Sequence, residues 1–223
     1  MDIKILYEDN HVLVVEKPPN LLTQGDQTGD ADLLSVLKED LKIRYNKPGN
    51  VYLGLIHRLD RPVGGAMVFA RTSKAASRLS EQIRLRTFGK TYLAVIHGTP
   101  PKSEDTLVHY LEKEEATNTV HVTTKPEEGK KAILEYALQD TREGLSLVQV
   151  RLHTGRPHQI RVQFSAIGHP LYGDQKYGAS RNKPGMQLAL WSAEVGFDHP
   201  TLGSRLSFRS PPPSAYPWNL FVK

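Results

Sequence analysis

The chain has 223 residues, with 29 Lys and Arg against 24 Asp and Glu, so its formal net charge is +5 with histidine neutral. Hydrophobic residues make up 39% and charged residues 24%, which excludes disorder, collagen and coiled coil. The lack of cysteine excludes disulfides and cysteine nucleophiles. No apolar run approaches the roughly 20 residues of a transmembrane helix, and the first 16 residues lack the pattern of a signal peptide. We therefore expect a cytoplasmic protein with no membrane partner.

The first half of the chain predicts four strands and two helices. Strand-like apolar runs occur at 3–7, 11–16, 51–56 and 66–70. The first two of these runs indicate a β-hairpin. Leucines recur at helical spacing from Asp32 until residues 46–49, which are suited to end a helix. A loop rich in Gly and Pro covers residues 57–65, and Thr72 or Ser73 is placed to cap a second helix.

The second half of the chain is mostly strand. Strands are expected at 90–97, 106–111, 118–124, 131–139, 145–153, 187–197 and 204–209. Pro157 suits the first turn of a helix that Gly168 would end, and the acidic stretch 112–129 indicates a surface hairpin. Two or three helices among about ten short strands predict an α+β fold, with a mixed, largely antiparallel sheet flanked by helices. We expect a single domain over residues 1–223.

Several common catalytic motifs are absent from the sequence. Gly89-Lys90-Thr91 resembles the end of a phosphate-binding loop, but Arg84 stands where that motif requires glycine. There is no dinucleotide-binding glycine motif, no H-E-x-x-H and no nucleophile elbow. His153 and His158, five residues apart, are interpreted as structural histidines rather than as a pair of metal ligands. We therefore expect neither a cofactor nor a metal.

Two segments concentrate residues that carry chemistry. In residues 57–65, Asp60 stands between Arg58 and Arg61, and nearby positive charge favours an ionised carboxylate. Gly64 and Gly65 would allow close approach of a backbone or a ligand. In residues 152–164, Arg, His and Gln side chains gather around a helix start that could bind phosphate. A surface turn and a solvated basic helix are the alternative interpretations of these two segments.

Together the segments resemble the RluA-type RNA pseudouridine synthases. The family motif H-R-L-D stands at 57–60, and the motif T-G-R-x-H-Q-I-R-V stands at 154–162. The K-x-Y-x-A strand at 90–94 and the continuation at 168–174 are also similar to the family. The opening of the chain is similar to the start of the family's catalytic domain, so we expect no S4 RNA-binding domain before it.

The resemblance implies which residues act. The family isomerises uridine in RNA to pseudouridine without a cofactor, using an aspartate as catalytic nucleophile. It assigns that role to Asp60 and assigns Arg161 to an ion pair with this aspartate. Tyr92 matches the tyrosine that stacks on the base and takes the C5 proton, and Arg58 matches the residue that holds the target base flipped out of its stack.

The expected partner is RNA, either an rRNA or a tRNA stem-loop, and monomer is the default oligomeric state. Arg156 and His158 are assigned to phosphate or base contacts. Arg84 and Arg86, at a basic helix end, are assigned to the RNA backbone. Two alternatives stay open at this point. One is a non-catalytic RNA-binding protein of the same fold, and the other is a glycoside or nucleoside hydrolase, which normally uses two carboxylates.

Overall fold

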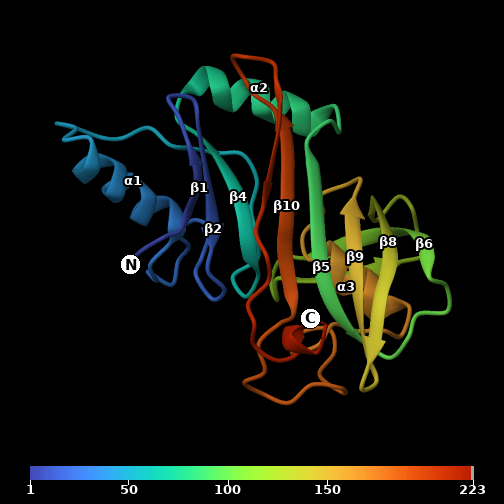
Figure 1. The fold of residues 1–223 in the computed structure, drawn as a ribbon. Coiled ribbons are helices and arrows are strands. Elements are labelled where there is room, and N and C mark those ends of the chain that lie inside the picture. Colours follow the sequence, from blue (N-terminus) through green and yellow to red (C-terminus); the bar gives the residue numbers. More distant parts are fainter. Residues whose placement is uncertain (222–223) are drawn as a thin grey trace. The chain divides into compact units, whose positions relative to one another are not determined.

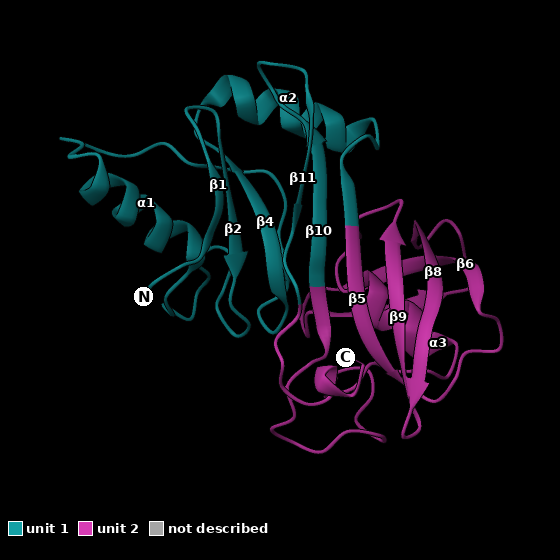
Figure 2. Ribbon diagram, in the orientation of Figure 1, with its two compact units in different colours: residues 1–90, 192–211 teal, residues 91–191, 212–223 magenta. Residues whose placement is uncertain are grey.

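The computed structural model describes residues 1–221. The chain forms two compact units (Figure 2). Unit 1 comprises residues 1–90 and 192–211, and unit 2 comprises residues 91–191 with the segment from residue 212 onward. Two of the three boundaries fall inside strands, β5 (Gly89–His97) and β10 (Leu190–Asp198), and the third, between residues 211 and 212, lies outside any strand. Among the described residues no helix is long and apolar enough to cross a membrane.

Unit 1 contains a sheet and two helices (Figure 1). Its elements are β1 (Ile5–Glu8), β2 (Val12–Lys17), α1 (Leu33–Arg44), β3 (Gly54–Leu55), β4 (Gly64–Ala70), α2 (Ser73–Arg84), part of β10, and β11 (Arg205–Arg209). The strand order is β1-β2-β4-β10, with β3 paired to β4 and β11 paired to β10. The expected hairpin is confirmed, because β1 and β2 pair antiparallel.

Both predicted helices of unit 1 are confirmed. In α1 the leucines at 33, 37 and 41 are buried, and the Asp32 side chain caps the helix by accepting from the Ser35 amide. In α2 the cap is Thr72, whose side chain accepts from the Ala75 amide. The inner face of α2 joins a core that includes alternate residues of β2 and β4. The helices form where the sequence places a cap before a stripe of apolar residues.

Strand β4 explains two local features of unit 1. β2 pairs with one edge of β4 from Gly65 to Ala70. The strand predicted at 51–56 was too long, because the structure has only β3, two residues long, in this segment. β3 pairs with Phe69 and Ala70 at the end of β4, and β10 pairs with the same edge of β4. Gly65 has φ +113° and lies so close to the Ser192 backbone that a Cβ atom would overlap it. The expected close backbone approach is therefore confirmed at Gly65.

Unit 2 contains a second run of antiparallel strands. Its elements are most of β5, β6 (Glu104–Glu114), β7 (Thr119–Thr123), β8 (Lys130–Arg142), β9 (Leu145–Leu152), α3 (Gln159–Ala166) and the short 3₁₀ helix η1 (Trp218–Leu220). The strands follow the order β5-β9-β8-β6-β7, and all four pairings are antiparallel. β6 and β7 form the surface hairpin expected from the acidic stretch. The α+β fold with a largely antiparallel sheet is confirmed.

The third helix begins later than its sequence suggested. Pro157 was expected in the first turn of the helix, but α3 starts at Gln159, after His158 takes a left-handed conformation with φ 51°. The Gln159 side chain accepts from the Arg156 amide at 3.0 Å and so stabilises this turn. Gly168 follows the last turn with φ +83°, as expected of a helix end. Phe164 of α3 packs against Tyr136 of β8, with the ring centroids 5.4 Å apart.

Candidate active site

Asp60 lies in unit 1, in the turn that connects β3 to β4. The Val63 amide donates to the Asp60 carbonyl at 3.0 Å and closes the turn around Arg61. Leu59 and Val63 are buried on either side, whereas Asp60 is partly exposed. The turn therefore fixes the aspartate backbone between two apolar anchors and leaves the residue accessible to solvent.

A neighbouring loop of unit 1 holds this turn in place. The Thr23 hydroxyl donates to the Leu59 carbonyl at 2.8 Å, and it accepts from the Leu59 amide at 3.3 Å. The Asn20 amide donates to the Arg61 carbonyl at 2.8 Å. The residues before and after Asp60 are thus both bonded to the segment 20–23, which restricts the position of Asp60.

Lys17, the last residue of β2, is fully buried beneath the same turn. Its Nζ donates to three carbonyl oxygens, those of Pro18 at 3.0 Å, Leu21 at 2.6 Å and Arg61 at 3.1 Å. Burial lowers the pKa of Lys17 to about 7, although the negative charge of Asp60 acts to raise it. Sequence analysis missed this residue, because nothing in a lysine at the end of an apolar strand indicates burial.

His57 begins the turn and has a structural role. Its Nε2 accepts from the Val68 amide of β4 at 3.0 Å, and its ring lies against Phe88 at 5.5 Å. Burial lowers the pKa of His57 to about 3, and the positive charge of Lys90 contributes in the same direction. The imidazole is therefore neutral near pH 7 and ties the start of the turn to the sheet.

The two arginines beside Asp60 differ in their contacts. The Nη1 of Arg61 pairs with Asp30 at 2.7 Å, and its Nε donates to the Asn20 carbonyl at 3.3 Å. Arg58 is exposed. The guanidinium of Arg61 thus neutralises Asp30, whereas Arg58 is placed to meet a ligand from solvent.

Tyr92 lies in unit 2, on β5, where it is 6% exposed. β5 pairs with β9 on one side, with Tyr92 opposite Val150. On its other edge the Val95 amide donates to the Ala189 carbonyl at 3.0 Å, and the Val95 carbonyl accepts from the Tyr172 amide at 2.8 Å. β5 therefore has hydrogen-bonded neighbours on both edges and is a central strand of unit 2.

Arg161 lies on α3 in unit 2 and is almost fully buried. Its Nε and Nη2 donate to the two carboxylate oxygens of Asp174, at 2.8 and 2.9 Å. Its guanidinium also lies over the Tyr177 ring, 5.1 Å from the centroid. Neither Asp174 nor Tyr177, which follow Arg161 by 13 and 16 residues, was assigned a role from the sequence. The expected ion pair between Arg161 and Asp60 stays a prediction.

His158 and Arg156 lie at the start of α3. The Nδ1 of His158 and the Tyr177 hydroxyl are 2.5 Å apart, and the same hydroxyl accepts from the Val120 amide at 3.0 Å. The Nε of Arg156 donates to the Lys131 carbonyl at 3.0 Å. Both side chains are only partly buried. The structure thus brings His158 and Arg161 together around Tyr177.

Arg84 and Arg86 lie in unit 1, at and just beyond the end of α2. Both are exposed. Arg84 forms an ion pair with Glu81 one turn earlier in the helix. Arg86 has a left-handed backbone with φ 61°, and its side chain makes no ion pair within residues 1–221. Arg86 is therefore the better placed of the two to bind phosphate.

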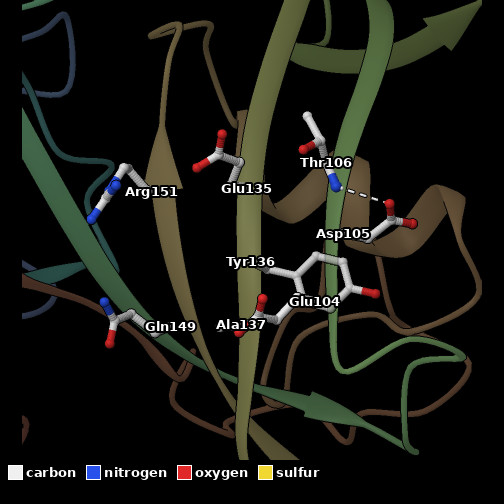
Figure 3. A pocket seen from close by; sticks show the side chains of 8 residues that line it. All are labelled: Glu104, Asp105, Thr106, Glu135, Tyr136, Ala137, Gln149 and Arg151. Atoms are coloured by element: carbon white, nitrogen blue, oxygen red, sulfur yellow. Dashed lines mark hydrogen bonds between the residues drawn. The ribbon is translucent and has the colours of Figure 1, made fainter.

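Unit 2 also contains a pocket that none of these residues lines (Figure 3). Residues of β6, β8 and β9 line it, and they include three carboxylates and one guanidinium: Glu104, Asp105, Thr106, Glu135, Tyr136, Ala137, Gln149 and Arg151. None of the predicted site residues belongs to this set. In the described part of the chain, no three His, Asp or Glu side chains gather as metal ligands.

Comparison with known proteins identifies the family of this chain. A family model described as RNA pseudouridylate synthase matches residues 11–166. The chain belongs to the RNA pseudouridylate synthase family. It is 32% identical over 216 residues to an uncharacterized RNA pseudouridine synthase, YlyB, of Bacillus subtilis. The aligned region covers 96% of this chain and 70% of that relative. It is 31% identical over 240 residues to ribosomal large subunit pseudouridine synthase D of Pseudomonas aeruginosa, and this alignment covers 99% of this chain and 71% of that relative.

Solved structures show the same fold. Human RNA pseudouridylate synthase domain containing 4 superposes with a TM-score of 0.79 over 94% of this chain and 88% of that one, at 22% identity. Human RNA pseudouridylate synthase domain containing 1 superposes with a TM-score of 0.75 over 96% of this chain and 85% of that one, at 24% identity. As a member of the pseudouridylate synthase family, the chain is an isomerase that acts on uridine in RNA.

Proposed function

We propose that this chain converts uridine in a structured RNA to pseudouridine, with Asp60 as the catalytic nucleophile. The observation that carries the proposal is the turn at 57–63. There the backbone on both sides of Asp60 is bonded to the segment 20–23 and to Lys17, while Asp60 itself remains partly exposed. A nucleophile must be held in one place and must still reach its substrate.

The reaction is an isomerisation, so its atoms balance within the nucleoside. The bond between N1 and C1′ breaks, the base turns, and C5 forms a new bond to C1′. The C5 proton leaves and N1 gains one. The carboxylate of Asp60 acts on the nucleoside while the base is detached, and attack at C1′, attack at C6 and formation of a glycal are all compatible with one aspartate.

Three further residues are proposed to assist Asp60. Tyr92 stacks on the detached base and takes the C5 proton. Arg161 pairs with Asp60 and keeps it ionised and oriented through a charge-assisted hydrogen bond. Arg58, which is exposed next to Asp60 in sequence, holds the target uridine out of its stack. Arg156 and His158 contact phosphate or base.

The proposed substrate is a stem-loop of rRNA or tRNA. Several relatives are named as ribosomal large subunit pseudouridine synthases, which supports rRNA as the first RNA to test. The net charge of +5 favours association with a polyanion.

The test is to map pseudouridine in RNA from cells that lack this gene, before and after incubation with the purified protein. We expect new pseudouridine at defined positions. Asp60→Asn is nearly isosteric but cannot act as a carboxylate nucleophile, so it should abolish the product while leaving the melting temperature and RNA binding intact. The matched control is Asp40→Asn, which removes a surface carboxylate paired with Arg44 on α1 and should leave the activity unchanged.

Other outcomes would contradict the proposal in distinguishable ways. Binding of RNA without any pseudouridine would indicate a non-catalytic RNA-binding protein. Release of free uracil would indicate a hydrolase. An Asp60→Asn variant with activity close to that of the wild type would show that another group is the nucleophile.

A further inference from the structure

The interaction between Arg161 and Asp174 is a side-on, two-bond ion pair inside unit 2. Nε and Nη2 of the arginine each donate to a different oxygen of the carboxylate, at 2.8 and 2.9 Å. The side chain of Asp174 is 0% exposed and that of Arg161 is 8% exposed. Two parallel bonds fix the plane of a guanidinium, which a single bond does not. The edge that carries Nη1 is then directed away from Asp174.

Asp174 is itself held rigidly. Its Oδ1 accepts from the amides of Lys176 and Tyr177 at 3.0 and 3.1 Å, in addition to Arg161. Its own amide donates to the Leu171 carbonyl, and its carbonyl accepts from the Gly178 amide. The carboxylate therefore sits in a turn whose backbone defines its direction.

A buried asparagine fixes this turn from the other side. Asn182 is 6% exposed, and its Nδ2 donates to the carbonyls of Leu171, Asp174 and Gly178 at 3.0, 3.2 and 2.9 Å. Its Oδ1 accepts from the Gly173 amide at 2.7 Å and lies 2.8 Å from the Nε2 of His97 on β5. Asn182 thereby bonds the turn that contains Asp174 to a central strand.

Tyr177 limits the arginine in a second direction. The guanidinium lies over its ring at 5.1 Å, and the Tyr177 hydroxyl is held by the Val120 amide and by His158. The Asp174 carboxylate thus restricts rotation of the Arg161 guanidinium in the guanidinium plane, and the Tyr177 ring covers one face of the guanidinium. Residues 174 and 177 both lie beyond the segment 11–166 that the family model matches.

We propose that Asp174 is a positioning residue for the isomerisation, which fixes the orientation of the Arg161 guanidinium and acts on the reaction only through it. This inference rests on the proposed role of Arg161 toward Asp60. Asp174 does not contact the substrate. Loss of its carboxylate lets Arg161 rotate and therefore reduces the rate of the chemical step while RNA binding is retained.

The first experiment is a double-variant cycle on the full chain, with Asp174→Asn, Arg161→Met and the two combined. Asp174→Asn keeps an oxygen for the two backbone amides but loses the second acceptor and the charge. We expect kcat for pseudouridine formation to fall about 100-fold, as for misplacement of a reacting group, with the RNA dissociation constant unchanged. In the Arg161→Met background the same change should lower kcat little further, because residues that act as a unit are not additive.

The matched control is Asp140→Asn. Asp140 pairs with Arg142 at 2.7 Å on the surface of β8, so this change removes an Asp–Arg pair outside the network and should leave kcat unchanged. A merely structural role of Asp174 would lower the rate by the same factor in both backgrounds. That result, or a kcat for folded Asp174→Asn equal to that of the wild type, would overturn the proposal.

A second measurement does not depend on the folding of any variant. Side-chain ¹⁵N NMR of the wild-type protein reports rotation about the Nε–Cζ bond of Arg161. We expect slow rotation and separate Nη signals, and a single averaged signal would overturn the proposal. If the wild-type protein makes no pseudouridine, the proposed function fails, while this measurement still decides whether the Arg161 guanidinium is held in one orientation.

Discussion

Tyr92 combines a buried ring with a hydroxyl that can transfer a proton. Its position on a central strand of unit 2 fixes the ring, and its exposure of 6% leaves little of it accessible. On position alone a core tyrosine would be the simpler interpretation, and only the family motif at 90–94 favours a catalytic role. The two functions of this side chain can be separated, because phenylalanine retains the ring and loses the hydroxyl.

We predict that Tyr92→Phe binds RNA with nearly normal affinity and forms pseudouridine at least about 100-fold more slowly, since acid–base groups typically contribute 10²–10⁴-fold. Stacking of the ring on a base should persist. Single-turnover kinetics with the protein in excess over RNA measure the rate, and a filter-binding assay measures the affinity.

The control for Tyr92→Phe is Tyr136→Phe in the same unit. Tyr136 is 4% exposed, and its hydroxyl donates to the Lys102 carbonyl at 3.2 Å. Its loss should cost about 1 kcal/mol of stability, as for a typical hydrogen bond, without changing the rate. Normal turnover by Tyr92→Phe would show that the Tyr92 hydroxyl has no chemical role.

At the scale of secondary-structure elements, Lys17 joins the end of β2 to the turn of Asp60. Its Nζ bonds to three carbonyls, one buried (Leu21) and two partly buried (Pro18 and Arg61). We predict that Lys17→Met destabilises the protein by about 1–3 kcal/mol, because it leaves these acceptors without their donor. It should also lower activity by loosening the turn. Lys4→Met, which removes only an exposed ion pair with Glu16, should have little effect on either quantity.

The pH dependence of this effect has a defined sign. The pKa of Lys17 falls from 10.5 in a free side chain to about 7 in the folded protein, chiefly because of burial. Between these values the unfolded chain binds the proton and the folded chain does not, so stability rises with pH. The loss of unfolding free energy on Lys17→Met should therefore be larger near pH 10 than near pH 6. Urea denaturation at the two pH values measures it, and an equal loss at both would contradict the assigned burial of the charge.

Elements with a complete local signal could be predicted from the sequence. α1 and α2 have a capping side chain followed by apolar residues at helical spacing, and both form where expected. The start of α3 could not be predicted, because it depends on the left-handed conformation of His158 and on the contact between Gln159 and the Arg156 amide. The length of β3 depends on which strands share the edge of β4, and that is a property of the sheet topology.

The candidate site divides in the same way. Asp60 could be singled out from the sequence, because the resemblance to the family includes four consecutive residues, 57–60, and its catalytic role stays a prediction. Asp174 and Lys17 could not, since their roles arise from contacts across 13 and 44 residues of sequence. A carboxylate in a glycine-rich turn and a lysine at a strand end have the same local patterns as solvated residues.

At the scale of the whole molecule, the net charge of +5 does not say which cations are available to RNA. Arg61, Arg84, Arg142 and Arg161 each have a carboxylate partner. Arg86 makes no such pair among residues 1–221 and is exposed. Pairing should reduce the contribution of an arginine to counterion release, so the basic helix end should act mainly through Arg86.

We predict that Arg86→Gln weakens RNA binding and reduces the slope of log affinity against log salt by about one unit, as expected when one phosphate contact is lost. Arg84→Gln should reduce the slope less, because Glu81 already neutralises this arginine. Glu81→Gln should have the opposite effect, since it releases Arg84 to bind phosphate and so steepens the slope. Turnover at saturating RNA should be nearly unchanged in all three variants. Equilibrium binding from low to high salt measures the slopes, and four identical slopes in the wild type and these variants would mean that the end of α2 lies outside the RNA interface.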